Sequence, residues 1–187
     1  MTDKILRIFI IIVIGIIFFG LLVGGTHFYQ KFIYQNPLEK ALTKIEGIKV
    51  VELKQDKNHL VMELEFNSPE GLRKNFYLLL EQLQEQKIND LEHCLIKIKN
   101  TSYNEELANF LKEAKLPLYE AINTGHFTAL PEQLTVLSQK DKLTYDLEID
   151  KQFIFITVNK GESFAHLVIN NGDSPLKIIT IGGEEYF

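Results

Sequence analysis

The longest apolar run in the chain lies near its N-terminus. Residues Ile8 to Val23 include no polar side chain, and Gly24 and Gly25 extend the run. At about 1.5 Å of helical rise per residue, residues 8–25 reach roughly 27 Å, close to the hydrocarbon thickness of a bilayer. The pattern therefore predicts a single transmembrane helix over residues 8–25, in contact with the lipid bilayer.

The residues around this predicted span indicate its orientation. Residues 1–7 contain Lys4 and Arg7 and form a short basic n-region, and no Ala-x-Ala site follows the apolar run. This favours an uncleaved signal anchor over the alternative of a cleaved signal peptide, whose apolar region is shorter. The positive-inside rule then predicts residues 1–7 in the cytoplasm, a juxtamembrane linker over residues 26–35, and an extracytoplasmic domain held at the plasma membrane by one pass.

Over residues 36–100 the apolar positions recur at helical and strand spacing in turn. Asn36-Pro37 and Ser68-Pro69 each pair a capping residue with a proline, which is typical of a helix start. The predicted elements are a helix after Asn36, strands over 48–53 and 60–66, a helix over 69–86 and a strand over 94–98. We therefore expect an αββαβ module in which two helices cover one face of a three-stranded sheet.

This order of elements resembles that of small modules that oligomerise within bacterial envelope machines. The ring-building domains of secretion and sporulation complexes are examples, and they too tend to follow a single membrane helix. The resemblance covers residues 36–99 and lies in the element order, not in a residue motif. Because many unrelated domains share such an order, it implies an assembling envelope component only by analogy.

Residues 101–187 change from helical to strand patterning. Ser102 to Glu105 match a capping box, Pro117 is expected to break or kink the helix that follows, Gly125 to end it, and Pro131 to begin another. Strand candidates then lie at 143–149, 153–158, 164–169 and 176–181, separated by Asn- and Gly-containing turns. We expect a helical segment and a C-terminal antiparallel β-meander, so the whole chain belongs to the α+β class. The pattern leaves open whether 101–187 packs with 36–100 as one domain.

Composition narrows the classes of partner. Hydrophobic residues make up 45% of the chain, with thirteen Phe and seven Tyr, which is enough for a packed core. The net charge is −5 and no Lys/Arg cluster is present, so binding to nucleic acid is not expected. The single cysteine, Cys94, excludes an intramolecular disulfide and any Cys-rich metal site.

No residue pattern predicts a reaction. The five histidines form no metal-binding or catalytic motif; they are His27, His59, His93, His126 and His166. His93 and Cys94 are adjacent in a strand and should point to opposite faces, which leaves the thiol buried. Glu63 and Glu65 are expected on the solvent side of their strand. We therefore predict no catalytic, cofactor-binding or metal-binding residues, and no cofactor.

The sequence is compatible with three functions. The leading hypothesis is a single-pass, membrane-anchored, non-enzymatic envelope protein whose domain binds a protein partner and self-assembles into a homo-oligomer. The first alternative is an anchored small-ligand or signal sensor with a pocket lined by Phe153, Phe155 and Phe164. The second is a hydrolase or metal enzyme with a dispersed site, which would require two or more of His59, His93, His126 and His166 to lie near one point.

Overall fold

A computed structural model describes residues 36–186, apart from 57–58, 87, 89–90, 102–103, 173 and 183–184. The predicted n-region, transmembrane helix and linker, residues 1–35, lie outside the described residues. Among the residues that are described, no helix is long and apolar enough to cross a membrane. The part of the chain from Ala41 onwards forms one compact unit, to which the rest of the description applies.

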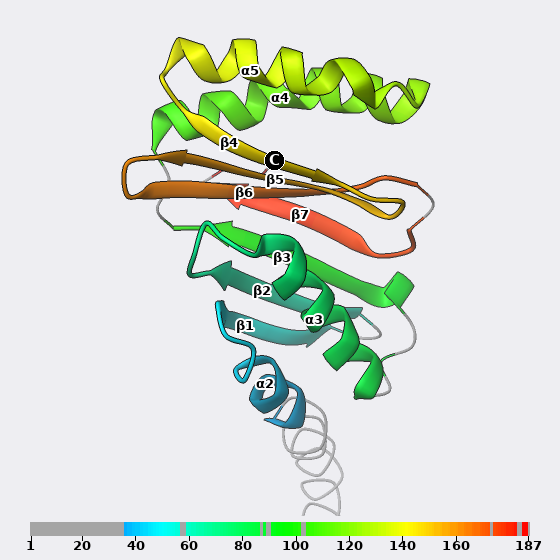
Figure 1. Ribbon diagram of the computed structural model, residues 1–187. Coiled ribbons are helices and arrows are strands. Elements are labelled where there is room, and N and C mark those ends of the chain that lie inside the picture. The colour runs from blue at the N-terminus through cyan, green and yellow to red at the C-terminus, as the bar shows by residue number, and fades with distance from the viewer. Residues whose placement is uncertain are drawn as a thin grey trace, which may run out of the picture. The chain divides into compact units, whose positions relative to one another are not determined.

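The unit is an α+β structure with two sheets, which confirms the predicted class (Figure 1). The described part of the chain begins with the short helix α2 (Asn36–Leu42). The first sheet combines three strands that follow this helix with two strands near the end of the chain. Its strand order is β1-β2-β3-β7-β8, with β1 at Ile48–Asp56, β2 at His59–Phe66, β3 at Cys94–Asn100, β7 at Lys177–Gly182 and β8 at Glu185–Tyr186. We call it sheet A.

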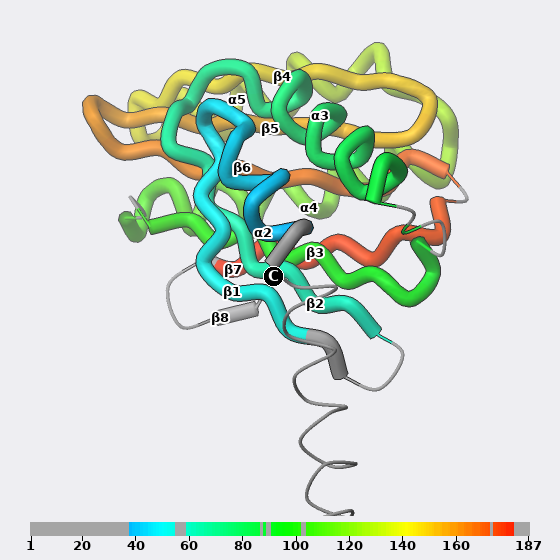
Figure 2. Tube along the Cα trace, turned by 90° about the horizontal axis from the view of Figure 1, so that it is seen from below, coloured from blue at the N-terminus to red at the C-terminus, as the bar shows by residue number. Residues whose placement is uncertain are grey.

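The helix α3 (Leu72–Glu85) connects β2 to β3, which run parallel and therefore need a crossover connection. Alternate residues of both strands are buried, and so are Leu72, Phe76, Leu79 and Leu83 along one stripe of α3. Figures 1 and 2 both place α3 on one side of sheet A. The alternating pattern of β2 and β3 thus marks the face of sheet A that is buried, and the helical pattern marks the stripe of α3 that packs against this face.

The second sheet, sheet B, is an antiparallel meander of β4 (Thr144–Ile149), β5 (Phe153–Lys160) and β6 (Ser163–Asn170). The helices α4 (Glu105–Thr124) and α5 (Leu130–Lys140) cover one of its faces, where Ile154, Ile156 and Val158 join their buried cluster. On the opposite face, Phe153 and Phe155 contact Phe76 of α3. Strand β5 is therefore buried on both faces.

The last predicted strand of the meander does not belong to it. Strand β7 belongs to sheet A, where it pairs with β3 in parallel, from Leu95 with Lys177 to Asn100 with Gly182. The expected three-stranded sheet is in consequence a five-stranded one. The prediction that β7 continues the antiparallel meander after β6 was wrong, because alternation shows that a segment is a strand but carries no information about which strand it will pair with.

Helix α4 also differs from the prediction. It runs without interruption from Glu105 to Thr124 with Pro117 inside it, so of the expected break or kink the break does not occur. Its N-cap is Asn104, whose side chain accepts a hydrogen bond from the Leu107 amide. Ser102, the capping residue expected from the sequence, lies outside the described residues. The buried stripe on both sides of the proline holds the helix together. Gly125 ends the helix at φ 71°, as predicted.

Candidate functional site

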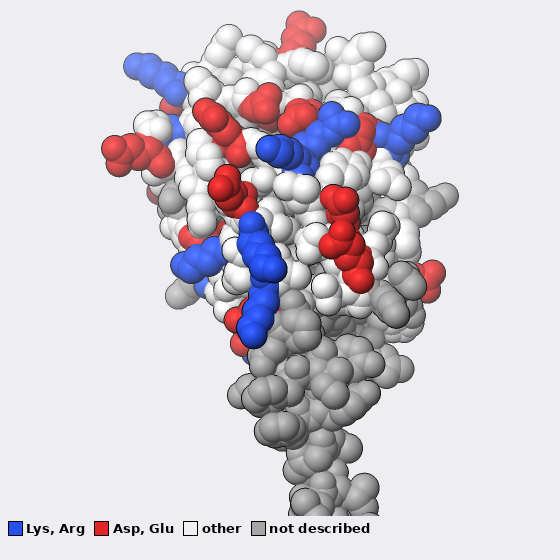
Figure 3. All heavy atoms as spheres, turned by 60° about the horizontal axis from the view of Figure 1, so that its bottom comes forward, with Lys and Arg blue, Asp and Glu red and all other residues white. Residues whose placement is uncertain are grey.

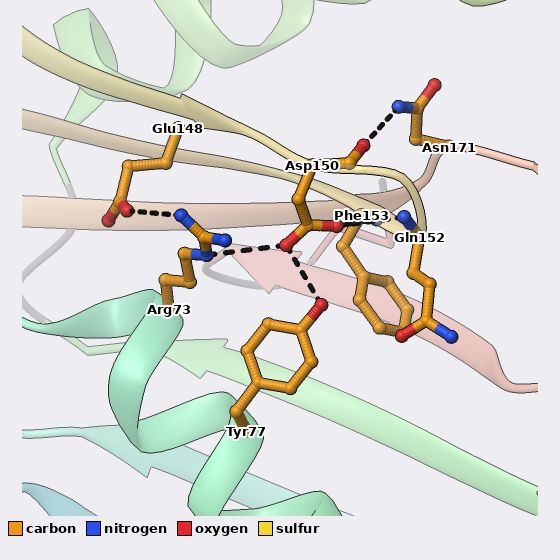
Figure 4. Close-up of polar contacts among 7 residues, drawn as sticks. All are labelled: Arg73, Tyr77, Glu148, Asp150, Gln152, Phe153 and Asn171. Atoms are coloured by element: carbon orange, nitrogen blue, oxygen red, sulfur yellow. Dashed lines mark hydrogen bonds and ion pairs between the residues drawn. The ribbon is translucent and has the colours of Figure 1, made fainter.

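A polar cluster joins α3 to the turn between β4 and β5 (Figure 4). Arg73 and Tyr77 lie one helical turn apart and point to the same side of α3. The Arg73 guanidinium lies 3.4 Å from Glu148 and 3.3 Å from Asp150, and the Tyr77 hydroxyl donates a hydrogen bond of 2.9 Å to Asp150. These contacts hold α3 against the end of sheet B.

Asp150 is the acceptor at the centre of this cluster. Its second carboxylate oxygen accepts hydrogen bonds from the amides of Gln152 and Phe153, at 2.8 and 2.9 Å, and so closes the β4–β5 turn. Burial acts to raise the pKa of this carboxyl group, but the hydrogen bonds from Phe153, Gln152 and Tyr77 and the charge of Arg73 outweigh it. The pKa of Asp150 is lowered as a result.

Tyr77 shifts in the opposite direction. Burial, and then the hydrogen bond to Asp150 and its charge, raise the pKa of Tyr77 to about 12. At neutral pH the cluster therefore combines an ionised carboxylate with a protonated phenol, and neither group exchanges a proton readily. This arrangement suits the fixing of a helix against a turn better than acid–base catalysis.

Open hollows lie on both sides of α3. One, of about 480 Å³, lies between the helix and Gln152 of the β4–β5 turn. The other, of about 740 Å³, lies between the helix and residues 41–47. Lys74 and Leu78 line both, so they form the ridge that separates the two hollows.

The three phenylalanines expected to line one ligand pocket do not come together. Phe153 and Phe155 are each 2% exposed and pack in an aromatic cluster with Phe76 and Tyr77. Phe164 lies at the other end of the β5–β6 hairpin, because Phe153 pairs with Asn170 and Asn159 pairs with Phe164. The small-ligand alternative thus lacks the pocket from which it was argued.

Of the four histidines in the described part of the chain, His126 and His166 lie apart, and two others meet. His126 follows α4 on the surface, and His166 is buried in β6, where its ring contacts the Thr157 hydroxyl and the Ser68 carbonyl. His59 and His93, however, lie side by side with their ring centres 5.2 Å apart. Sequence spacing gave no sign of this pair, because it depends on β2 and β3 becoming neighbours. No group of three or more His, Cys, Asp or Glu suited to a metal ion occurs in the described part of the chain.

Glu63 and Glu65 are paired with lysines and not with each other. Glu63 lies 3.3 Å from Lys99, and Glu65 lies 3.3 Å from Lys49 and accepts a hydrogen bond from Thr101. That hydrogen bond is the main cause that lowers the pKa of Glu65. Figure 3 shows the same mixture of acidic and basic side chains over the surface that it displays. The two glutamates thus form ion pairs with lysines of the neighbouring strands on the surface of sheet A.

Cys94 is buried, with an exposed fraction of 2%. It shares the buried side of β3 with Ile96 and Ile98, as expected from strand alternation.

Comparison with known proteins adds no assignment: no family model matches the chain, and no match was found among curated proteins or solved structures.

Proposed function

We propose that this chain is a single-pass, membrane-anchored, non-enzymatic envelope protein whose α+β domain binds protein, including a second copy of itself. The apolar run over residues 8–25 supports the anchor, with the basic residues before it on the cytoplasmic side. The orientation would place the domain outside the cytoplasm. The polar cluster around Asp150, with both of its titrating groups far from neutrality, favours a binding role over a catalytic one.

The observation that carries the proposal is a set of apolar side chains exposed on the helix pair α4–α5. Leu116 is 78% exposed, Tyr119 is 53% exposed and Val136 is 58% exposed. Leu116 and Tyr119 are one turn apart on α4. Val136 lies on the neighbouring helix α5, whose opposite side carries the buried residues Leu130 and Leu134. We call these three residues the helix-pair patch. A contiguous exposed apolar surface is typical of a protein contact, and the proposal requires these three side chains to form one.

The outer edge of β1 is a poorer candidate for the interface. A register shift between Val50 and Glu52 bends this edge strand, and the exposed side chains of Lys49 and Lys54 carry charges along it. Bulges and lysines are the usual means by which proteins prevent pairing between edge strands. Pairing through β1 is thus disfavoured, and contact through the helix-pair patch is preferred.

The size of the patch suggests how tight the contact would be. Burial of a Leu, Val or Tyr side chain stabilises a complex by about 1.5–3 kcal/mol, and association itself costs a similar total. Two copies would therefore associate weakly in dilute solution. Anchoring in one membrane raises their effective concentration and favours the complex.

The test is the mass of the full chain in detergent micelles, measured by light scattering across a range of protein concentrations. We expect the mass to rise from one chain to two or more, and Leu116→Glu to shift this transition to at least about tenfold higher concentration. Asn109→Glu is the matched control, because it places the same charge at another exposed position of α4. A monomer at every concentration would contradict self-association.

A second measurement covers other partners. A photo-crosslinking side chain at position 116, in the native membrane, should give a discrete crosslinked protein band that the same side chain at position 109 does not give. If positions 116 and 109 give the same products, protein binding through the helix-pair patch is excluded.

A further inference from the structure

His59 and His93 meet at one end of two neighbouring strands. His59 is the first residue of β2, and His93 is the last residue of the 3₁₀ turn Leu91–His93 that leads into β3. The two strands run parallel and Leu60 pairs with Cys94, so the histidines occupy the preceding step of the same register. Their ring centres are 5.2 Å apart, and the ring planes are inclined by 54°.

This separation is the one that two imidazoles adopt on a single metal ion. A zinc–nitrogen bond is about 2.0–2.1 Å long and a ring nitrogen lies roughly 1.1 Å from its ring centre, so a tetrahedral ion holds two ring centres about 5 Å apart. The pair could therefore bind one ion without movement of the strands.

We propose that His59 and His93 form a two-histidine chelate for a divalent transition-metal ion, with Zn²⁺ as the reference ion. Zinc, nickel and copper ions bind imidazole nitrogen well, whereas magnesium and calcium ions favour oxygen ligands. His59 is exposed and His93 is half-buried, so an ion can reach both. Cys94 is buried on the inner face of β3 and does not take part.

The proposed chelate has two protein ligands, since no group of three or more His, Cys, Asp or Glu that could hold a metal ion occurs within the described residues. A zinc ion held by two protein ligands is bound less tightly than one in a structural site with four. The chelate would join the starts of β2 and β3. It depends neither on membrane anchoring nor on the helix-pair patch.

The test is calorimetric titration of the full chain in detergent with ZnCl₂. We expect one Zn²⁺ per chain with an affinity in the micromolar range, and a loss of about tenfold or more in His59→Ala and in His93→Ala. Removal of either ligand destroys the chelate, so the double variant should bind little worse than each single one. His126→Ala removes an exposed histidine elsewhere and should bind as the parent does.

A second measurement separates ligation from unfolding. Long-range proton–nitrogen spectra of the parent protein should show the ring nitrogens of His59 and His93 shifting with Zn²⁺ while those of His126 do not. Circular dichroism confirms that each variant is folded. If the parent binds no Zn²⁺ at micromolar concentrations, or if the variants at positions 59 and 93 bind it as the parent does, the two rings merely pack against each other.

Discussion

The carboxamide of Asn100 forms two hydrogen bonds with the backbone of His166. Its nitrogen donates to the His166 carbonyl at 3.0 Å, and its oxygen accepts from the His166 amide at 2.8 Å. Asn100 ends β3 in sheet A, and His166 lies in β6 at one edge of sheet B. The side chain thus takes the place that a neighbouring strand would occupy, and it links the two sheets.

Replacement of Asn100 by Ala should lower the free energy of unfolding by about 2–4 kcal/mol. The change removes both hydrogen bonds and leaves the buried amide and carbonyl of His166 without a partner, at about 1–3 kcal/mol for each group. Urea denaturation at pH 7 measures the difference. Asn109→Ala, at an exposed site, is the control and should change stability by less than about 0.5 kcal/mol. An equally small effect at Asn100 would show that the link contributes nothing.

The protein should lose stability as the pH falls from about 6.5 to about 4. Burial, opposed by the hydrogen bond to the Ser68 carbonyl, lowers the pKa of His166 from 6.5 to about 4. Between these values the unfolded chain takes up a proton that the folded chain does not, so the stability present above pH 6.5 is lost on acidification. The full loss is about 3 kcal/mol, and about 2 kcal/mol of it has occurred by pH 5.

Urea denaturation at pH 7 and pH 5 measures this effect, and His166→Gln provides the control. The glutamine variant is less stable at pH 7 but should lose little further stability at pH 5. Asp150 and Glu65, whose lowered pKa values matter only below about pH 4.5, do not interfere in this range. Equal pH dependence in the parent and the variant would show that His166 is not responsible.

Tyr77→Phe should destabilise the protein by about 1–2 kcal/mol. The change removes only the hydroxyl that donates to Asp150, a hydrogen bond to an ionised group, and leaves the ring packing unchanged. Asp150→Ala should cost more, because the amides of Gln152 and Phe153 also lose their acceptor. Thermal unfolding compares the two variants with Tyr119→Phe, which alters an exposed tyrosine and should have no effect. A larger loss for Tyr77→Phe than for Asp150→Ala would contradict this ranking.

Pro117→Ala should raise the free energy of unfolding by about 1–3 kcal/mol. Proline inside a helix lacks the amide hydrogen and destabilises the helix by about 3 kcal/mol relative to Ala. Proline also restricts the unfolded chain, which stabilises the folded state by up to about 1 kcal/mol and offsets part of this cost. Pro131 lies at the start of α5, where proline is tolerated, so Pro131→Ala should change stability little. Chemical denaturation measures both variants. A destabilised Pro117→Ala would show that the proline ring makes contacts that outweigh its backbone cost.

Several structural features could be predicted from local patterns alone. Alternating side chains identified β2, β3 and β4, and apolar runs separated by Asn- and Gly-containing turns identified β5 and β6. The helical stripe of Leu72, Phe76, Leu79 and Leu83 predicted α3, and Gly125 correctly marked the end of α4. The burial of Cys94 followed from the same alternation.

Other features required the folded chain. Pro117 stays within a helix because the buried residues on both sides stabilise it, a contribution that local propensity does not include. The polar cluster around Asp150 joins residues that are more than seventy positions apart in sequence. No periodic signal connects such residues, so the cluster could not be anticipated.

The sequence by itself determined the α+β class, the apolar run at the N-terminus and the existence of most strands and helices, because each depends on the order of side chains over a few residues. Only the tertiary structure decided that β7 pairs with β3, that Asn100 reaches His166 and that His59 meets His93. These contacts depend on which strands become neighbours, and that choice is made by the packing of the whole domain.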